Sequence, residues 1–102
     1  MSTETTGGAK NNQAALRRTV MIINQRGLHA RAAAKFVKLA GEFDAEVAVE
    51  RNGTAVSGMS IMGLMMLAAA TGCEIEIAVT GREAASALAA LSKLVSDGFD
   101  ET

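Results

Sequence analysis

The sequence contains one histidine, His29, at the point where a β-like run ends and a helical pattern begins. The apolar run 20–23 precedes it, and an alanine-rich run over 32–40 follows. An imidazole at a helix start faces unpaired backbone N–H groups and the positive end of the helix dipole. Arg31 adds a fork of N–H donors that matches three-oxygen anions. A nucleophile beside an anion-binding group indicates a histidine that accepts a phosphoryl group.

A plainer role for His29 is to orient the turn or to cap a backbone group, and Arg31 alone would be an ordinary solvated charge. The neighbouring Gly27 and Leu28, together with a second motif downstream, favour phosphoryl transfer. Neutral imidazole suits a relay because it is nucleophilic near neutral pH. The amides of Ala30 and Arg31 at the helix start are candidates to hold the phosphate oxygens.

The second motif is a short apolar helix with Ser60 as its predicted N-cap. Helical geometry places Leu64 and Leu67 toward the core and leaves three partly exposed residues as a docking patch: Ile61, Met62 and Met65. Methionine suits surfaces that repack against several partners, although such a stripe is also typical of a core. Lys35 and Lys38 are candidate rim residues of this patch, or plain solvated helix residues.

Hydrophobic periodicity predicts the elements that position these residues. The expected strands cover 18–23, 46–50, 54–57 and 74–79, and the expected helices cover 30–40, 60–67 and 83–96. Asn52–Gly53 predicts a hairpin, Val20 and Ile22 should face the core, and Gly41 should end the first helix. The order βαββαβα with one-sided alternation predicts an α+β fold. In it, helices cover one face of a four-stranded antiparallel sheet.

Composition narrows the functional classes. The net charge of -1 and the absence of Trp and Tyr argue against a nucleic-acid partner. With one cysteine and one histidine, neither an intrachain disulfide nor a metal site is expected. We see no signal peptide and no membrane-spanning run, so a cytoplasmic protein is expected. Residues 1–17 are expected to form a flexible tail, and 18–102 one globular domain.

The two motifs together resemble the HPr family, the histidine phosphocarriers of the phosphoenolpyruvate-dependent sugar phosphotransferase system. The first motif is the run 27–31 followed by apolar pairs at 33–34 and 36–37. The second is the run 60–65 followed by Leu67 and Gly72. The resemblance extends from about residue 18 to 95, and it implies an open-faced β-sandwich in which four antiparallel strands carry three helices.

The resemblance implies that His29 accepts a phosphoryl group on Nδ1 from phospho-enzyme I and passes it to IIA domains of sugar permeases. Arg31 would stabilise the phosphate, and Ser60 would be the site of a regulatory serine kinase/phosphorylase. Such a protein is a stoichiometric carrier, not an enzyme, needs no cofactor, and is expected to be a monomer.

Two residues depart from the family pattern. Ala32 stands where proline is usual, which should leave a slightly looser helix start. Met59 stands where a lysine usually precedes the regulatory serine, and this weakens the case for a kinase at Ser60. Three alternatives remain open: a nitrogen-branch paralogue that serves regulatory proteins, a regulatory binding module without phosphoryl relay, and a small-ligand sensor.

Overall fold

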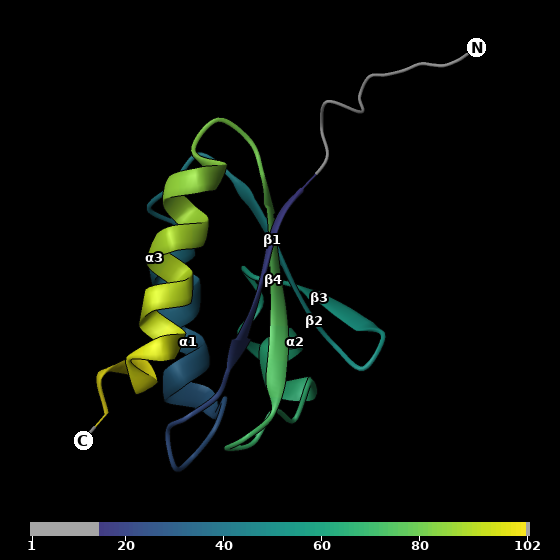
Figure 1. Ribbon diagram of the computed structural model, residues 1–102, viewed down its shortest axis with the longest axis vertical. Helices are drawn as coiled ribbons and strands as arrows, with labels where there is room; N and C mark the ends of the chain where they lie inside the picture. The colour runs from purple at the N-terminus through teal and green to yellow at the C-terminus, as the bar shows by residue number, and fades with distance from the viewer. Residues whose placement is uncertain (1–14, 102) are drawn as a thin grey trace.

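The computed structural model describes residues 15–101 and forms two layers, a sheet and the helices that cover it (Figure 1). The elements in chain order are β1 (Leu16–Met21), α1 (Ala30–Ala40), β2 (Glu46–Arg51), β3 (Thr54–Ser57), α2 (Ile61–Met66), β4 (Glu74–Thr80) and α3 (Ala84–Ser96). A 3₁₀ turn, η2 (Gly98–Asp100), follows α3. The predicted order βαββαβα and the α+β class are confirmed.

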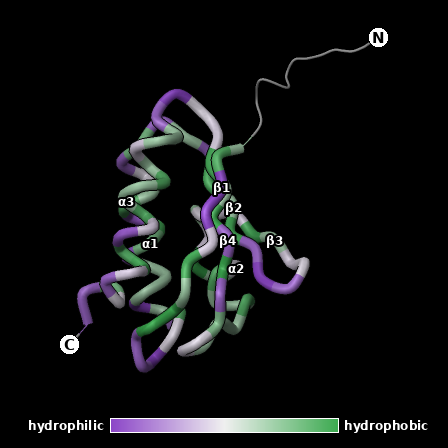
Figure 2. Tube along the Cα trace, viewed as in Figure 1, coloured by the Kyte–Doolittle hydropathy of each residue, from purple (hydrophilic) through white to green (hydrophobic). Residues whose placement is uncertain are grey.

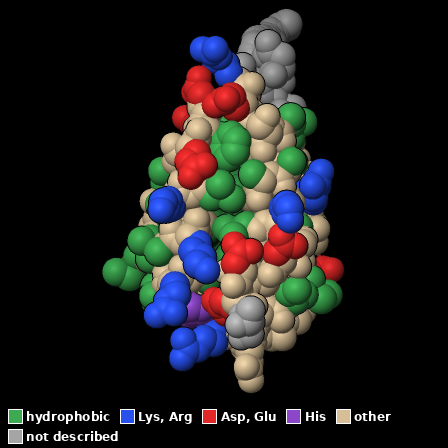
Figure 3. Space-filling view, turned by 90° about the vertical axis from the view of Figure 1, so that its left-hand side faces the viewer, with side chains coloured by type: hydrophobic (Ala, Val, Ile, Leu, Met, Phe, Trp, Pro, Cys, Tyr) green, Lys and Arg blue, Asp and Glu red, His purple; other side chains and the backbone are tan. Residues whose placement is uncertain are grey.

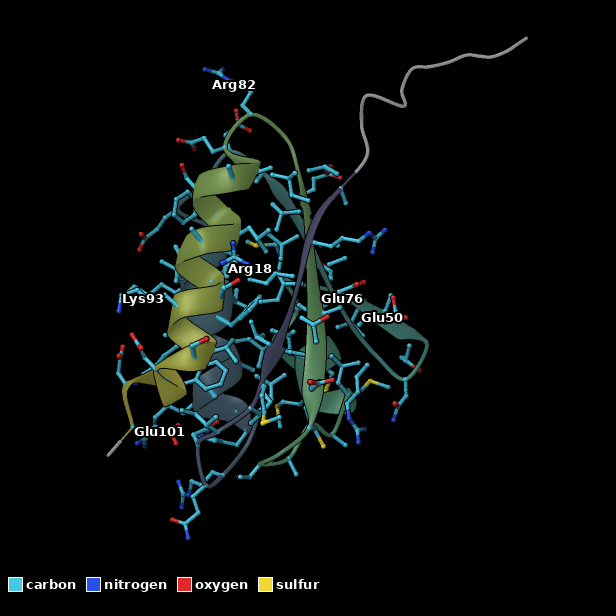
Figure 4. All side chains as sticks on the ribbon, in the orientation of Figure 1. Arg18, Glu50, Glu76, Arg82, Lys93 and Glu101 are labelled. Carbon is cyan, nitrogen blue, oxygen red and sulfur yellow. The ribbon has the colours of Figure 1, made fainter. Side chains whose placement is uncertain are left out.

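The sheet is four-stranded and antiparallel, with the strand order β1-β4-β2-β3. Within β4, Ile75, Ile77 and Val79 are buried beneath the helices, as their alternation predicts. Figure 4 shows Glu50 and Glu76 on the side of the sheet that faces away from the helices. The polar half of each alternation therefore forms the open face, and the site described below lies at one end of the helical layer.

The first strand differs from its predicted range of 18–23. It begins at Leu16, which pairs with Val79, and it ends at Met21, which pairs with Glu74. The partner strand sets these limits: Val79 and Ala78 pair with Leu16 and Arg17 at one end, and β4 begins at Glu74, the partner of Met21, at the other. Of the predicted tail over 1–17, residues 1–14 lie outside the described residues.

The core lies between the sheet and the inner faces of α1 and α3. The predicted inward residues Val20 and Ile22 are buried, and Phe36 of α1 is fully buried. Helical spacing also places Val37 of α1 and Leu94 of α3 toward the sheet, but both are only half-buried, at the edge of the core. Figure 2 shows the hydrophilic residues mostly in the loops at both ends of the molecule and on the outer turns of α3.

Candidate functional site

His29 is the N-cap residue of α1, with extended backbone angles of φ -80° and ψ -179°. Its Nδ1 accepts a hydrogen bond from the Arg31 backbone N–H at 3.2 Å. Its carbonyl oxygen accepts the first bond of the helix, from Ala33 N–H at 2.8 Å. Although proline is absent, α1 begins at Ala30, and Ala32 is fully buried. The histidine therefore caps the helix and also places a ring nitrogen at its positive end.

The loop before His29 is held against the segment that connects α2 to β4. Leu28 is buried, and its N–H donates to the carbonyl oxygen of Ala69 at 2.9 Å. The Thr71 hydroxyl donates to the carbonyl oxygens of Asn24 and Gln25. These bonds fix the backbone that carries His29 to an element more than forty residues away in the sequence.

The other ring nitrogen of His29 is paired with a carboxylate. Nε2 lies 2.6 Å from Glu101 Oε2, and the other oxygen of Glu101 accepts from Asn24 Nδ2 at 3.2 Å. The bonds from His29 and then Asn24 hold the pKa of Glu101 below its ordinary value. A carboxylate accepts hydrogen bonds, so the neutral ring carries its proton on Nε2. The lone pair is then on Nδ1, which agrees with the bond from Arg31.

Basic side chains surround this pair. A cleft of about 620 Å³ is lined by His29, by the carboxylates of Asp100 and Glu101, and by three cationic residues: Arg26, Arg31 and Lys35. Figure 3 shows the histidine beside a group of Lys and Arg side chains at one end of the molecule. The first turn of α1 contains no acidic residue. The cleft therefore combines a ring nitrogen, a helix N-terminus and positive charge, which suits an anion such as phosphate.

The two lysines predicted for the rim differ in their surroundings. The Lys35 ammonium donates to the carbonyl oxygen of Phe99 at 2.8 Å, so this side chain binds the segment after α3. Lys38 is exposed farther along α1. Lys35 is therefore not a plain solvated residue, because its ammonium group forms a hydrogen bond within the chain.

Ser60 and the docking patch lie on α2 and do not line the cleft. The Ser60 hydroxyl accepts from Gly63 N–H at 2.9 Å, so the predicted N-cap is confirmed. Leu64 and Leu67 are buried. The patch residues are exposed: Met62 by 70%, Ile61 by 41% and Met65 by 41%. The predicted division of this helix between core and surface is confirmed, and a docking role stays a prediction.

Sequence reasoning missed Glu101 and Asn24. Neither belongs to a periodic pattern, and 72 positions separate Glu101 from the histidine. The available signal was Phe99, a large apolar residue in an otherwise polar run, which is fully buried. A buried anchor at 99 would have indicated that the following acidic residues return to the body of the domain.

Neither a metal-binding cluster nor a membrane-spanning helix is found among residues 15–101. No group of three His, Cys, Asp or Glu side chains in this part of the chain is placed to hold a metal ion. Among the same residues, each helix is too short or too polar to cross a bilayer.

The fold and the cleft together define a small open-faced α+β domain of the histidine-carrier class. The family model described as PTS HPr component phosphorylation site matches residues 16–97. The chain therefore belongs to the HPr family, the phosphocarrier proteins of the phosphotransferase system.

Individual relatives agree with this assignment. The phosphocarrier protein HPr of Neisseria meningitidis is 49% identical over 86 residues, 84% of this chain and 97% of that protein. The phosphocarrier protein NPr of Escherichia coli is 42% identical over 87 residues, 84% and 97% of the two chains. An HPr crystal structure from Thermoanaerobacter tengcongensis superposes with a TM-score of 0.81 at 36% identity, and covers 85% of this chain and 98% of that one.

Proposed function

We propose that this protein is a cytoplasmic carrier in which His29 accepts a phosphoryl group from phospho-enzyme I and transfers it to IIA proteins. The observation that supports this proposal most strongly is the orientation of the His29 ring. Nδ1 stands at the start of α1 with its lone pair directed at a helix amide, while Nε2 is held by Glu101. The nucleophilic nitrogen is thus placed where a helix N-terminus stabilises a phosphate.

The transfer step follows from this arrangement. The Nδ1 lone pair attacks phosphorus, an N–P bond forms, and the bond to the donor breaks with its electron pair staying on the donor. The Arg31 N–H, which loses its acceptor as Nδ1 is phosphorylated, becomes free to donate to a phosphate oxygen. The Arg31 guanidinium lines the same cleft and supplies charge-assisted bonds. Phosphoryl transfer needs mainly this kind of positioning and charge stabilisation.

The proposal is tested by incubating the protein with phosphoenolpyruvate and enzyme I and measuring its intact mass. We expect one acid-labile, base-stable phosphoryl group on the wild type and none on a folded His29→Ala variant. Arg31→Ala should slow transfer more than Lys38→Ala, the matched change of an exposed charge on the same helix. A phosphorylated His29→Ala protein would falsify the assignment, and equal losses at 31 and 38 would reduce Arg31 to part of a general basic surface.

A nitrogen-branch carrier is the second candidate function, because proteins called NPr are 42% and 44% identical to this chain. Both branches use the same histidine chemistry, so the choice depends on the acceptor. Phosphorylated protein should be offered to IIA proteins of sugar permeases and of the nitrogen branch in parallel. Transfer to sugar IIA proteins alone supports the first proposal. Phosphorylation without transfer to either would favour a regulatory binding module.

We also propose that Ser60 is a regulatory position next to the docking patch. Its hydroxyl caps α2, and the exposed residues Ile61 and Met62 follow it directly. A phosphate there would place about two negative charges beside an apolar docking surface. That charge opposes docking through the cost of its desolvation and through repulsion by an acidic partner.

A further inference from the structure

The segment after α3 adopts a backbone that needs external support. Gly98, Phe99 and Asp100 all have left-handed φ values, of 70°, 57° and 60°. This conformation is unfavourable for residues with a Cβ, so two of the three positions are strained. The burial of Phe99 and the bond from the Lys35 ammonium to its carbonyl oxygen hold the segment in place. Strain that is maintained in this way often accompanies a functional position.

This supported segment carries Glu101 to the histidine. Figure 4 shows Glu101 below the end of α3, at the end of the molecule where α1 begins. Glu101 Oε2 lies 2.6 Å from His29 Nε2. Its backbone N–H donates to the carbonyl oxygen of Gly98 at 3.1 Å, which closes the turn. The carboxylate therefore reaches the ring from a backbone that is held by the turn before it.

Asn24 orients the carboxylate. Its side chain is only 6% exposed, and Nδ2 donates both to Glu101 Oε1 and to the carbonyl oxygen of Gly27. Both partners of this amide atom are oxygen atoms, so the atom must be the nitrogen of the NH₂ group. The orientation of the Asn24 amide is thereby determined. Asn24 Oδ1, the side-chain oxygen, is buried, and no residue among 15–101 donates a hydrogen bond to it. Burying an unpaired oxygen atom costs free energy. The position of the Asn24 amide is therefore determined by the two hydrogen bonds that its NH₂ group donates.

We propose that Glu101, oriented by Asn24, is a positioning residue for phosphoryl transfer at His29. This inference rests on the function proposed above. The carboxylate keeps the ring proton on Nε2 before, during and after transfer. Only in that tautomer does the neutral ring present a lone pair on Nδ1, the nitrogen at the start of α1.

The same contact stabilises the charge that develops in the reaction. When the Nδ1–P bond forms and the donor takes away the electron pair of the broken bond, the ring becomes cationic because the Nε2 proton stays in place. Glu101 offsets that charge through a charge-assisted hydrogen bond. In onward transfer the N–P bond breaks and its electron pair returns to Nδ1, so a neutral imidazole leaves. The Nε2 proton is never released in either direction.

The test compares Glu101→Gln with Asp97→Asn. Glutamine keeps the shape and one acceptor oxygen but removes the charge. Asp97→Asn removes a carboxylate four positions away, which accepts from the Lys93 ammonium at 2.6 Å and does not line the cleft. Melting temperatures are measured to check that both variants are folded, and a Glu101→Ala variant removes the contact altogether.

The first readout is the imidazole NMR spectrum with ¹⁵N-labelled protein. We expect the wild type to show a downfield Nε2–H proton that exchanges slowly with water. In Glu101→Gln this resonance should move upfield, in Glu101→Ala it should disappear through exchange, and in Asp97→Asn it should be unchanged. A proton on Nδ1 in the wild type would overturn the proposal without any variant.

The second readout is the kinetics of phosphorylation by phosphoenolpyruvate and enzyme I. Replacing a charge-assisted bond with a neutral one should lower kcat about tenfold, with little change in KM. Asp97→Asn should keep the wild-type kcat. If Glu101→Gln is as fast as wild type, Glu101 only ties down the segment after α3. If the wild type itself accepts no phosphoryl group, the proposed function fails instead, so the two failures are distinguishable.

Discussion

Replacing Gly27 with alanine should lower the free energy of unfolding much more than the same change at a glycine that also has a positive φ but has open space around it. Gly27 has a φ of 66°, and it lies two residues before His29. A Cβ at this position would approach the carbonyl oxygen of Ala69 to 2.5 Å and the Cα of Ala70 to 2.9 Å. Both contacts are with backbone, so no side-chain rotation can relieve them.

Two costs add for Gly27→Ala. A left-handed backbone costs alanine about 1–2 kcal/mol. Moving the backbone at 69–70 also strains or breaks the hydrogen bond from Leu28 N–H to Ala69, a further loss of about 1–3 kcal/mol if the buried groups stay unpaired. The total is about 2–5 kcal/mol in the free energy of unfolding. At about 4–8 °C per kcal/mol for a domain of this size, the melting temperature should fall by at least about 8 °C.

Gly53→Ala is the matched control. Gly53 has a φ of 83° in the hairpin between β2 and β3, and no other atom lies within 4 Å of a Cβ built there. This variant should lose only the backbone cost of about 1–2 kcal/mol. Urea denaturation of both variants measures the difference. Equal losses would show that the contact between the histidine loop and the segment at 69–70 contributes little.

Three further outcomes are expected. Met62→Asp should weaken docking to enzyme I and leave the melting temperature nearly unchanged, whereas Leu64→Asp on the buried side of α2 should unfold the domain; unfolding by both would place Met62 in the core. Ser60→Asp should slow phosphorylation of His29 at low salt, and added salt should partly restore the rate; equal rates at low salt would leave Ser60 as a helix cap only. Because the pKa of Glu101 is lowered on folding, its pair with His29 stabilises the protein above the ordinary carboxyl pKa of 4.5 and loses that contribution as pH falls below it. As pH falls below 4.5, the free energy of unfolding should therefore decrease less for Glu101→Gln than for wild type. Denaturation at a series of pH values measures this, and an equal decrease in both proteins would show that the Glu101–His29 pair contributes no stability.

The sequence by itself determined the elements and the two motifs, because both depend on local patterns. The alternation at 74–79 predicted β4, and the alanine-rich helical pattern over 32–40 predicted α1. Ser60 was recognisable as a cap because a hydroxyl before a helix has a local partner, here Gly63 N–H. The exposed position of Met62 also followed from helical spacing alone.

Only the tertiary structure determined which residues surround His29. Strand pairing set the limits of β1, since Leu16 pairs with Val79 and β4 begins at Glu74, the partner of Met21. The loop before the histidine takes its shape from Thr71 and Ala69, which no local pattern connects to it. Glu101 reaches the ring because Phe99 is buried and the backbone turns left-handed, an outcome of packing over 72 positions of sequence. Periodicity describes one element at a time, whereas this contact depends on how three elements pack together.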